Sequence, residues 1–302
     1  MRSAITIVFS LFLLTVSTPA QSYILDMARQ SARSDTRTGG SIEKAKILAN
    51  NSNLKLTVNV PSFKMTLWQE GKEVRTYYVG VGLKDYPIFV GLRKIDTVIF
   101  NPAWIPPHSK WVAPSLRGKV IGPSDPRNPL GKMKIPLGYG YLLHQAKSTR
   151  DQGSLVSHGC VRVLRNDLYD LNDKFLIAQG MDLTKEVTAA KRNRRTFVIE
   201  LEEPVNFEVT YDAIVVENKT LHIYPDVYGY RKDMLGDLRK ELKANGVDES
   251  SIADADLKAM IAKAKRKKQF VIALEDIQVG EFSKGKVVSV VPKPKPKRRR
   301  KR

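Results

Sequence analysis

Cysteine is almost absent from this chain, because Cys160 is the one thiol among 302 residues. A single thiol excludes an intramolecular disulfide. Histidine is scarce as well, with four residues in total, and the spacing of these histidines and the cysteine does not match a metal-binding pattern. We therefore expect no metal site.

Acidic residues are also few: 31 Asp and Glu stand against 51 Lys and Arg, giving a net charge of +20. Residues 292–302 contain eight cations and no anion, which leaves +12 on the rest of the chain. Such an excess indicates an anionic partner, which could be nucleic acid, a membrane or lipid surface, or an anionic polymer. We interpret residues 286–302 as a basic, disordered tail.

Long apolar runs are missing except at the N-terminus. Met1 and Arg2 give a short positive region, an apolar stretch runs from Ala4 to Val16, and small residues follow up to Ala20. This layout is typical of a signal peptide over residues 1–20, and the apolar core is shorter than the roughly 20 residues of a spanning helix. An uncleaved anchor is the alternative. We predict export to the periplasm or cell envelope, where nucleic acid is not an expected partner and a free thiol needs a functional reason.

A mainly β domain is predicted over residues 54–200. Alternating apolar residues indicate strands, a turn at 70–72 indicates a hairpin, and eight prolines between 101 and 140 favour loops. We expect a helix capped by Asn166 and ended by Gly180. The expected strands cover residues 54–60, 63–67, 74–81, 95–100, 139–144 and 198–201.

Two further regions flank this domain. Residues 21–53 are polar and are interpreted as a linker. Residues 201–285 combine short strand patterns with two amphipathic helix patterns, around 234–242 and 257–264, and predict a small α+β addition.

The segment with the strongest chemical signal is residues 157–162, Ser-His-Gly-Cys-Val-Arg. A thiol is a nucleophile as its thiolate and needs a base or a positive field nearby. Gly159 permits a tight turn whose backbone N–H groups can hold an oxyanion. Arg162 would return to the face of Cys160 if the segment is a strand. His144, which ends an apolar strand, is the candidate base; His158 is a weaker one, because adjacent strand residues point apart.

These residues resemble the Ser-His-Gly-Cys-x-Arg signature of the bacterial L,D-transpeptidases. Other segments in the right order also resemble that family, and sixteen residues separate His144 from Cys160, a spacing that the family uses. The resemblance covers about residues 54–200. Its other segments are residues 60–62, 78–82, 101–107, 128–131 and 138–144.

The resemblance implies the family's β-sandwich-like catalytic domain and a reaction without any cofactor. Cys160 would attack a diaminopimelate carbonyl in a tetrapeptide stem of peptidoglycan, with loss of D-alanine, and His144 would act as base. His158, Gly159 and Cys160 would form the oxyanion loop, and Arg162 would orient that loop and the substrate carboxylate. An amine of a second stem, an envelope protein lysine or water would take the acyl group. Ser157, Tyr141 and Trp104 are the candidate substrate contacts.

The sequence also departs from that family. Residues 145–147, Gln-Ala-Lys, replace the small residues that often follow the histidine, and residues 87–91 replace a Thr-Pro-x-Gly loop. Two alternatives therefore stay open. One is a hydrolase or amidase on the same scaffold. The other is a non-enzymatic, basic protein that binds anionic wall polymer or lipid surfaces through its tail.

Overall fold

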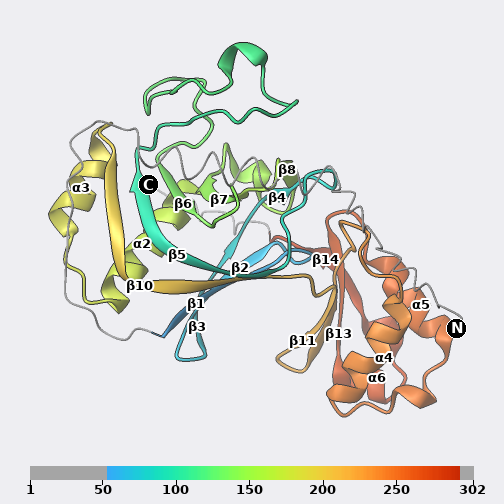
Figure 1. The fold of residues 1–302 in the computed structure, drawn as a ribbon. Coiled ribbons are helices and arrows are strands. Elements are labelled where there is room, and N and C mark those ends of the chain that lie inside the picture. The colour runs from blue at the N-terminus through green and yellow to red at the C-terminus, as the bar shows by residue number, and fades with distance from the viewer. Residues whose placement is uncertain (1–52, 293–302) are drawn as a thin grey trace, which may run out of the picture.

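A large eight-stranded sheet dominates the computed structural model, which describes residues 53–292 (Figure 1). The signal peptide and most of the linker predicted from the sequence lie outside these residues. A separate two-stranded parallel sheet joins β4 (Val81–Gly82) to β8 (Leu155–Ser157). In spatial order the large sheet contains β3 (Lys72–Tyr78), β2 (Lys64–Gln69), β1 (Leu54–Asn59), β10 (Phe197–Thr210), β5 (Gly91–Phe100), β6 (Met133–Pro136), β7 (Leu142–Gln145) and β9 (Val161–Val163).

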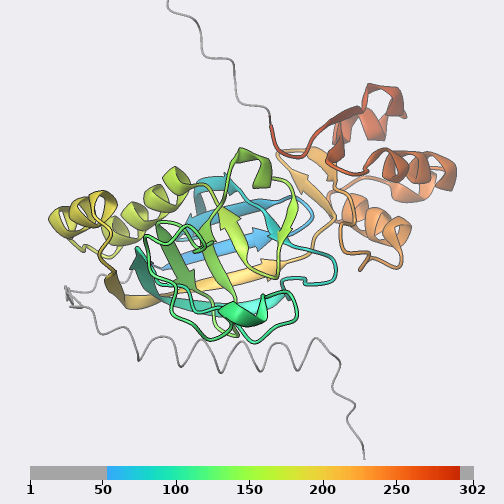
Figure 2. The same ribbon diagram turned by 90° about the horizontal axis from the view of Figure 1, so that it is seen from above.

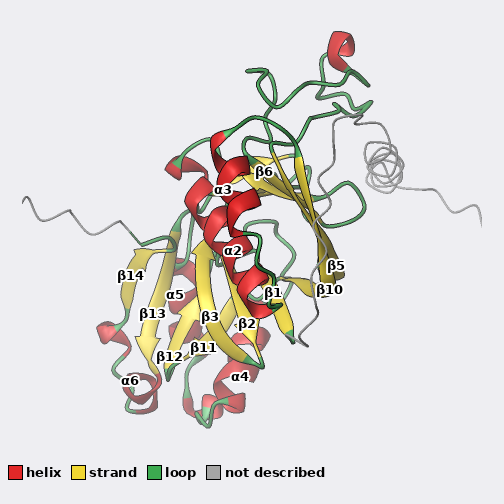
Figure 3. Cartoon of the chain, turned by 90° about the vertical axis from the view of Figure 1, so that its left-hand side faces the viewer, coloured by secondary structure: helices red, strands yellow, loops and turns green. Residues whose placement is uncertain are grey.

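The mainly β fold class predicted from the sequence is confirmed. Apolar residues at every second position of β1 and β10 produce alternating burial, and Leu56, Val58 and Phe207 are fully buried. Two helices, α2 (Arg165–Ala178) and α3 (Thr184–Arg192), pack beside the sheet (Figure 3). Helix α2 buries its apolar stripe and gives way to Gly180 at φ +65°.

Several local predictions differ from the structure. Helix α2 begins at Arg165 with Leu164 as its N-cap, so Asn166 lies inside the first turn and does not cap it. The strand expected from residue 139 begins at Leu142, because Tyr139 has a φ of +53° in a turn. Strand β6 and helix α3 were not expected. Segment 101–131 is otherwise loop-rich and rises above β6 and β7 (Figure 1).

A second unit follows β10 and lies on the side of the large sheet away from α2 and α3 (Figure 2). Its antiparallel sheet and its helices enclose a separate apolar core. Two short 3-10 helices, Glu249–Ser251 and Phe282–Lys284, belong to this unit. Two others, Pro114–Leu116 and Thr149–Asp151, precede β10 in the chain. The unit contains β11 (Ile214–Glu217), β12 (Thr220–Ile223), α4 (Met234–Ala244), α5 (Asp254–Lys263), β13 (Lys268–Ala273), α6 (Leu274–Gln278) and β14 (Lys286–Ser289).

The boundaries of the two units differ from the expected ones. Strand β10 continues to Thr210, so the first residues of the expected α+β addition, 201–210, belong to the large sheet. Strand β14 occupies residues 286–289 of the expected tail, whereas residues 293–302 lie outside the described part. Tyr224, Tyr228 and Val290 pack into the core of the large sheet, which ties the second unit to it.

Within residues 53–292, no helix has both the length and the apolar character needed to cross a membrane. The same residues contain no group of three or more His, Cys, Asp or Glu side chains arranged to hold a metal ion.

Candidate active site

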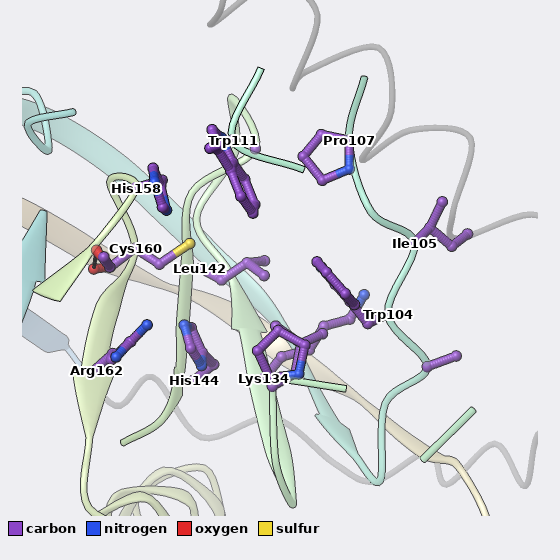
Figure 4. Close-up of a pocket in the computed structure, with 15 residues that line it drawn as sticks. Trp104, Ile105, Pro107, Trp111, Lys134, Leu142, His144, His158, Cys160 and Arg162 are labelled. Carbon is purple, nitrogen blue, oxygen red and sulfur yellow. Dashed lines mark hydrogen bonds between the residues drawn. The ribbon is translucent and has the colours of Figure 1, made fainter. Parts of the chain in front are cut away.

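A cavity of about 150 Å³ lies between the end of the large sheet and segment 101–131. Cys160 and His144 both line it, and the Cys160 sulfur points into it (Figure 4). The predicted site residues Trp104, Ser157, His158, His144, Cys160 and Arg162 all belong to the lining.

Strand register explains why these side chains meet. Strands β7 and β9 run parallel, with His144 opposite Arg162. Because strand side chains alternate, Leu142 and His144 face the same side as Arg162 and Cys160, which lies two residues before it. On the other side of β7, Lys134 of β6 is the register partner of His144. An imidazole therefore lies between two cationic residues in a row across three strands.

The turn that carries the nucleophile is held by its own side chains. The Ser157 hydroxyl donates a hydrogen bond to the Cys160 carbonyl at 2.5 Å. Gly159 has a φ of +108°, and a Cβ there would lie 2.6 Å from the ring of Tyr141. Only glycine fits this turn without displacing the ring behind it.

The Cys160 thiol is protonated at neutral pH. Burial raises its pKa to about 11, and the backbone at Leu142 and the charge of Arg162 only partly oppose that effect. The thiol thus needs a base at the moment of attack.

His144 is suited to that task. It is 4% exposed, and burial together with the charge of Arg162 lowers its pKa to about 4. The ring is therefore neutral at neutral pH. Its buried Nδ1 has no hydrogen-bond partner among residues 53–292. A neutral imidazole in the lining of the same cavity can accept a proton from the thiol.

Arg162 is anchored by an acid that the sequence analysis missed. Its Nη1 lies 3.2 Å from Oδ2 of Asp151, and the two side chains are only 15% and 11% exposed. The same Oδ2 accepts the Lys147 backbone N–H at 3.0 Å. Asp151 is the only acidic residue between His144 and Cys160 in the sequence, which could have indicated it as a partner for Arg162.

His158 occupies the opposite wall of the cavity. Its ring stacks on Trp111 at 4.2 Å between centroids and meets the Tyr86 ring edge-on at 4.6 Å. Burial and the charge of Arg162 lower its pKa. These contacts give His158 the position of an aromatic wall residue. Sequence analysis did not place Trp111 or Lys134 in the site.

The two remaining candidate substrate contacts differ in position. Trp104 lines the cavity, and its backbone pairs with Ile121 in both directions at 2.8 Å. Tyr141 lies outside the lining: it is buried behind Gly159, and its hydroxyl donates to the Pro87 carbonyl at 3.3 Å. Alternation along the strand explains this, since Tyr141 precedes Leu142 and so points to the reverse face.

Part of the chain matches a known protein family. Residues 54–187 match the YkuD family, described as the L,D-transpeptidase catalytic domain. Residues 54–187 are therefore similar to the L,D-transpeptidase catalytic domain. The chain is 25% identical over 173 residues to the probable L,D-transpeptidase YbiS of Escherichia coli strain K12, covering 55% of this chain and 56% of that protein. The chain thus spans about half the length of the curated relatives it matches.

Solved L,D-transpeptidases are more distant. An L,D-transpeptidase from Mycobacterium smegmatis is 14% identical with a TM-score of 0.35. The match covers 53% of this chain and 59% of that enzyme's chain. The catalytic domain of the Enterococcus faecium L,D-transpeptidase is 12% identical with a TM-score of 0.32. The match covers 49% of this chain and 97% of that domain's chain.

The residues after His144 stabilise the rim of the cavity. Oε1 of Gln145 accepts the Lys132 backbone N–H at 2.9 Å, and the Gln145 side chain fills the space beside Gly131. The Ala146 N–H donates to the Val163 carbonyl at 2.7 Å. The departure from the usual small residues therefore places a glutamine amide against the segment that carries Pro129 and Leu130 into the pocket lining.

Proposed function

We propose that this protein is a peptidoglycan L,D-transpeptidase in which Cys160 is the nucleophile and His144 the base. The observation that carries the proposal is a neutral, buried imidazole and the only cysteine of the chain in the lining of one cavity. The family match supports the reaction class.

The proposed acylation moves one proton and exchanges one bond. His144 takes the thiol proton as the sulfur attacks the diaminopimelate carbonyl that precedes D-alanine. The tetrahedral intermediate collapses, the C–N bond breaks, and His144 returns the proton to the departing amine of D-alanine. A thioester on Cys160 remains. An acceptor amine then attacks it, its proton passes through His144 to the sulfur, and the thiol is restored.

Charge in the cavity fits an anionic stem peptide. Lys134 and Arg162 supply two cations, and no Asp or Glu belongs to the lining. A substrate carboxylate would be attracted to this end of the cavity. The backbone N–H groups of His158, Gly159 and Cys160 would hold the oxyanion that develops during attack.

The acceptor and the location belong to the same proposal. An exported enzyme would meet stem peptides in the periplasm or cell envelope, where a second diaminopimelate or an envelope protein lysine offers the amine. The basic tail would hold the enzyme on anionic wall polymer or lipid head groups.

Mass spectrometry of products tests the proposal. The purified full chain and Cys160→Ala are each incubated with a disaccharide-tetrapeptide. We expect D-alanine loss and cross-linked dimers with the wild type only. Released tripeptide without dimers would instead make the enzyme a hydrolase. No product from a protein with an intact thiol would reject both activities.

A further inference from the structure

Tyr228 is a residue of the second unit that is buried in the core of the catalytic domain. It lies in the segment between β12 and α4 and is 2% exposed. Its hydroxyl donates to the Gly82 carbonyl at 3.0 Å and accepts the Ile88 backbone N–H at 3.4 Å. One side chain thus joins both ends of the segment 82–88.

The loop that presents Tyr228 is rigidly built. Asp226 accepts hydrogen bonds from the Tyr211 hydroxyl and from the backbone N–H groups of Tyr230 and Arg231. The Tyr211 hydroxyl in turn accepts the Tyr228 N–H at 2.7 Å. These hydrogen bonds hold the backbone at Tyr228 in place.

Segment 82–88 lies directly against the turn that carries Cys160. The Leu83 N–H donates to the Ser157 carbonyl at 2.8 Å, and the Tyr86 ring meets the His158 ring. Gly82 leaves no room for a side chain, because a Cβ there would lie 2.2 Å from the Tyr86 carbonyl oxygen and 3.1 Å from the Cα of Gly159. A shift of this segment would move the turn with it.

A series of hydrogen bonds connects the second unit to the nucleophile. The Tyr228 hydroxyl donates to the Gly82 carbonyl, and the N–H of the following residue, Leu83, donates to the Ser157 carbonyl. The Ser157 hydroxyl then donates to the Cys160 carbonyl. Each link is buried or partly buried, where a missing partner costs most.

We propose that Tyr228 is a positioning residue for Cys160, through which the second unit fixes the nucleophile turn. The inference rests on the proposed role of Cys160 as nucleophile, but not on the identity of the peptide substrate. It gives residues 211–231 a role in catalysis that lies outside the matched family segment, which ends at residue 187.

The test compares two single-hydroxyl deletions in the full chain. Tyr228→Phe removes the hydroxyl that bonds Gly82 and Ile88. Tyr224→Phe is the matched control, because Tyr224 is equally buried in the same core and its hydroxyl has no hydrogen-bond partner among residues 53–292. Three quantities are measured: the rate of Cys160 alkylation by iodoacetamide against pH, kcat and KM with the tetrapeptide, and the unfolding midpoint in urea.

We expect Tyr228→Phe to lower kcat about tenfold with little change in KM, because a displaced nucleophile weakens attack more than binding. Its alkylation profile should shift along the pH axis, since the thiol's surroundings change. Tyr224→Phe should match the wild type in both. If Tyr228→Phe loses stability but keeps the wild-type kcat and alkylation profile, its role is structural and the inference is rejected. If the wild type makes no product, the proposed function fails, yet the alkylation profiles still decide the role of Tyr228.

Discussion

Cys160 and His144 are both uncharged at neutral pH, although they line the same cavity. Burial raises the pKa of the thiol to about 11 and lowers the pKa of the imidazole to about 4. A thiolate–imidazolium pair is therefore not the resting state. In the proposed mechanism the proton leaves the sulfur as the substrate is attacked, which would tie reactivity to substrate binding.

A pH profile checks this charge state. The alkylation rate of Cys160 by iodoacetamide should rise about tenfold per pH unit from about pH 6 to pH 9, because the thiolate fraction rises with pH below the pKa. Mass spectrometry of the modified protein gives the rate. A constant rate from about pH 5 to pH 8 would instead indicate a preformed ion pair. The same alkylation profile is measured for His144→Ala as the control, because this variant lacks the proposed base but keeps the Cys160 thiol.

Arg162 should influence both stability and reactivity. Its charge lowers the pKa of Cys160 and of His144, so Arg162→Gln should raise both values and slow alkylation at a fixed pH. The substitution also leaves Asp151 buried without its ionic partner, at a cost of about 3 kcal/mol in the free energy of unfolding.

Urea unfolding measures that cost. Arg162→Lys is the matched control, because it keeps the charge and should retain most of the alkylation rate. Adding Asp151→Asn to Arg162→Gln should recover part of the lost stability, since the buried charge is gone. An unchanged unfolding free energy in Arg162→Gln would contradict the importance of this pair.

The nucleophile turn is the element on which the site depends most. Gly159→Ala adds a methyl group at a φ of +108° and 2.6 Å from the Tyr141 ring, so the turn has to shift. We expect at least about a hundredfold loss of activity, the scale that a 1 Å misplacement produces. Product formation by mass spectrometry provides the measurement.

A second glycine supplies the control for backbone strain. Gly246 has a similar positive φ of +76°, but nothing lies within 4 Å of its added Cβ. Gly246→Ala should cost about 1 kcal/mol of stability and leave activity unchanged. Equal activity losses in the two variants would show that general destabilisation, rather than the nucleophile turn, explains the effect.

The sequence predicts elements better than it predicts how they pair. Alternation locates β1, β2 and β5, and amphipathic stripes locate α4 and α5, because these signals are local. The strand expected over residues 198–201 is only the first part of β10, which continues to Thr210. The pairing of β10 with β5 is irregular between Glu200 and Val205. There the side chain of Gln179, which is distant in sequence, hydrogen bonds the backbones of residues 202 and 203.

The same limit applies to the site. Cys160, His144 and Arg162 are recognisable from one motif and its spacing. Lys134 and Asp151 are not, since they reach the site only through the register of β6 with β7 and through a loop contact. The position of Tyr141 follows from where β7 begins, which a turn at residue 139 decides.

At the scale of the whole molecule, the excess of positive charge should govern adhesion. Residues 293–302 hold eight of the cations that make the net charge +20. Deleting them should weaken binding to vesicles rich in phosphatidylglycerol, by about 1 kcal/mol for each cation that lies near the surface. Sedimentation with vesicles at increasing salt measures binding, which should fall with salt in the full chain.

The control for this deletion is the chemistry of the site. Alkylation of Cys160 should be unchanged, because the residues that line the cavity fall between positions 103 and 162. Replacing the eight cations with glutamine should weaken binding as much as the deletion does. Full binding by the glutamine variant would show that charge is not the cause.

Strand β10 has a consequence for the order in which this protein is assembled during synthesis. It lies between β1 and β5, and without it the large sheet separates into a β1–β3 half and a β5–β9 half. A ribosome has to make residue 210, which follows Cys160 by fifty positions, before the complete β10 can join the halves. The half that contains β7 and β9, beside Cys160, can therefore join the rest of the sheet only after one of the last strands of the domain has been made.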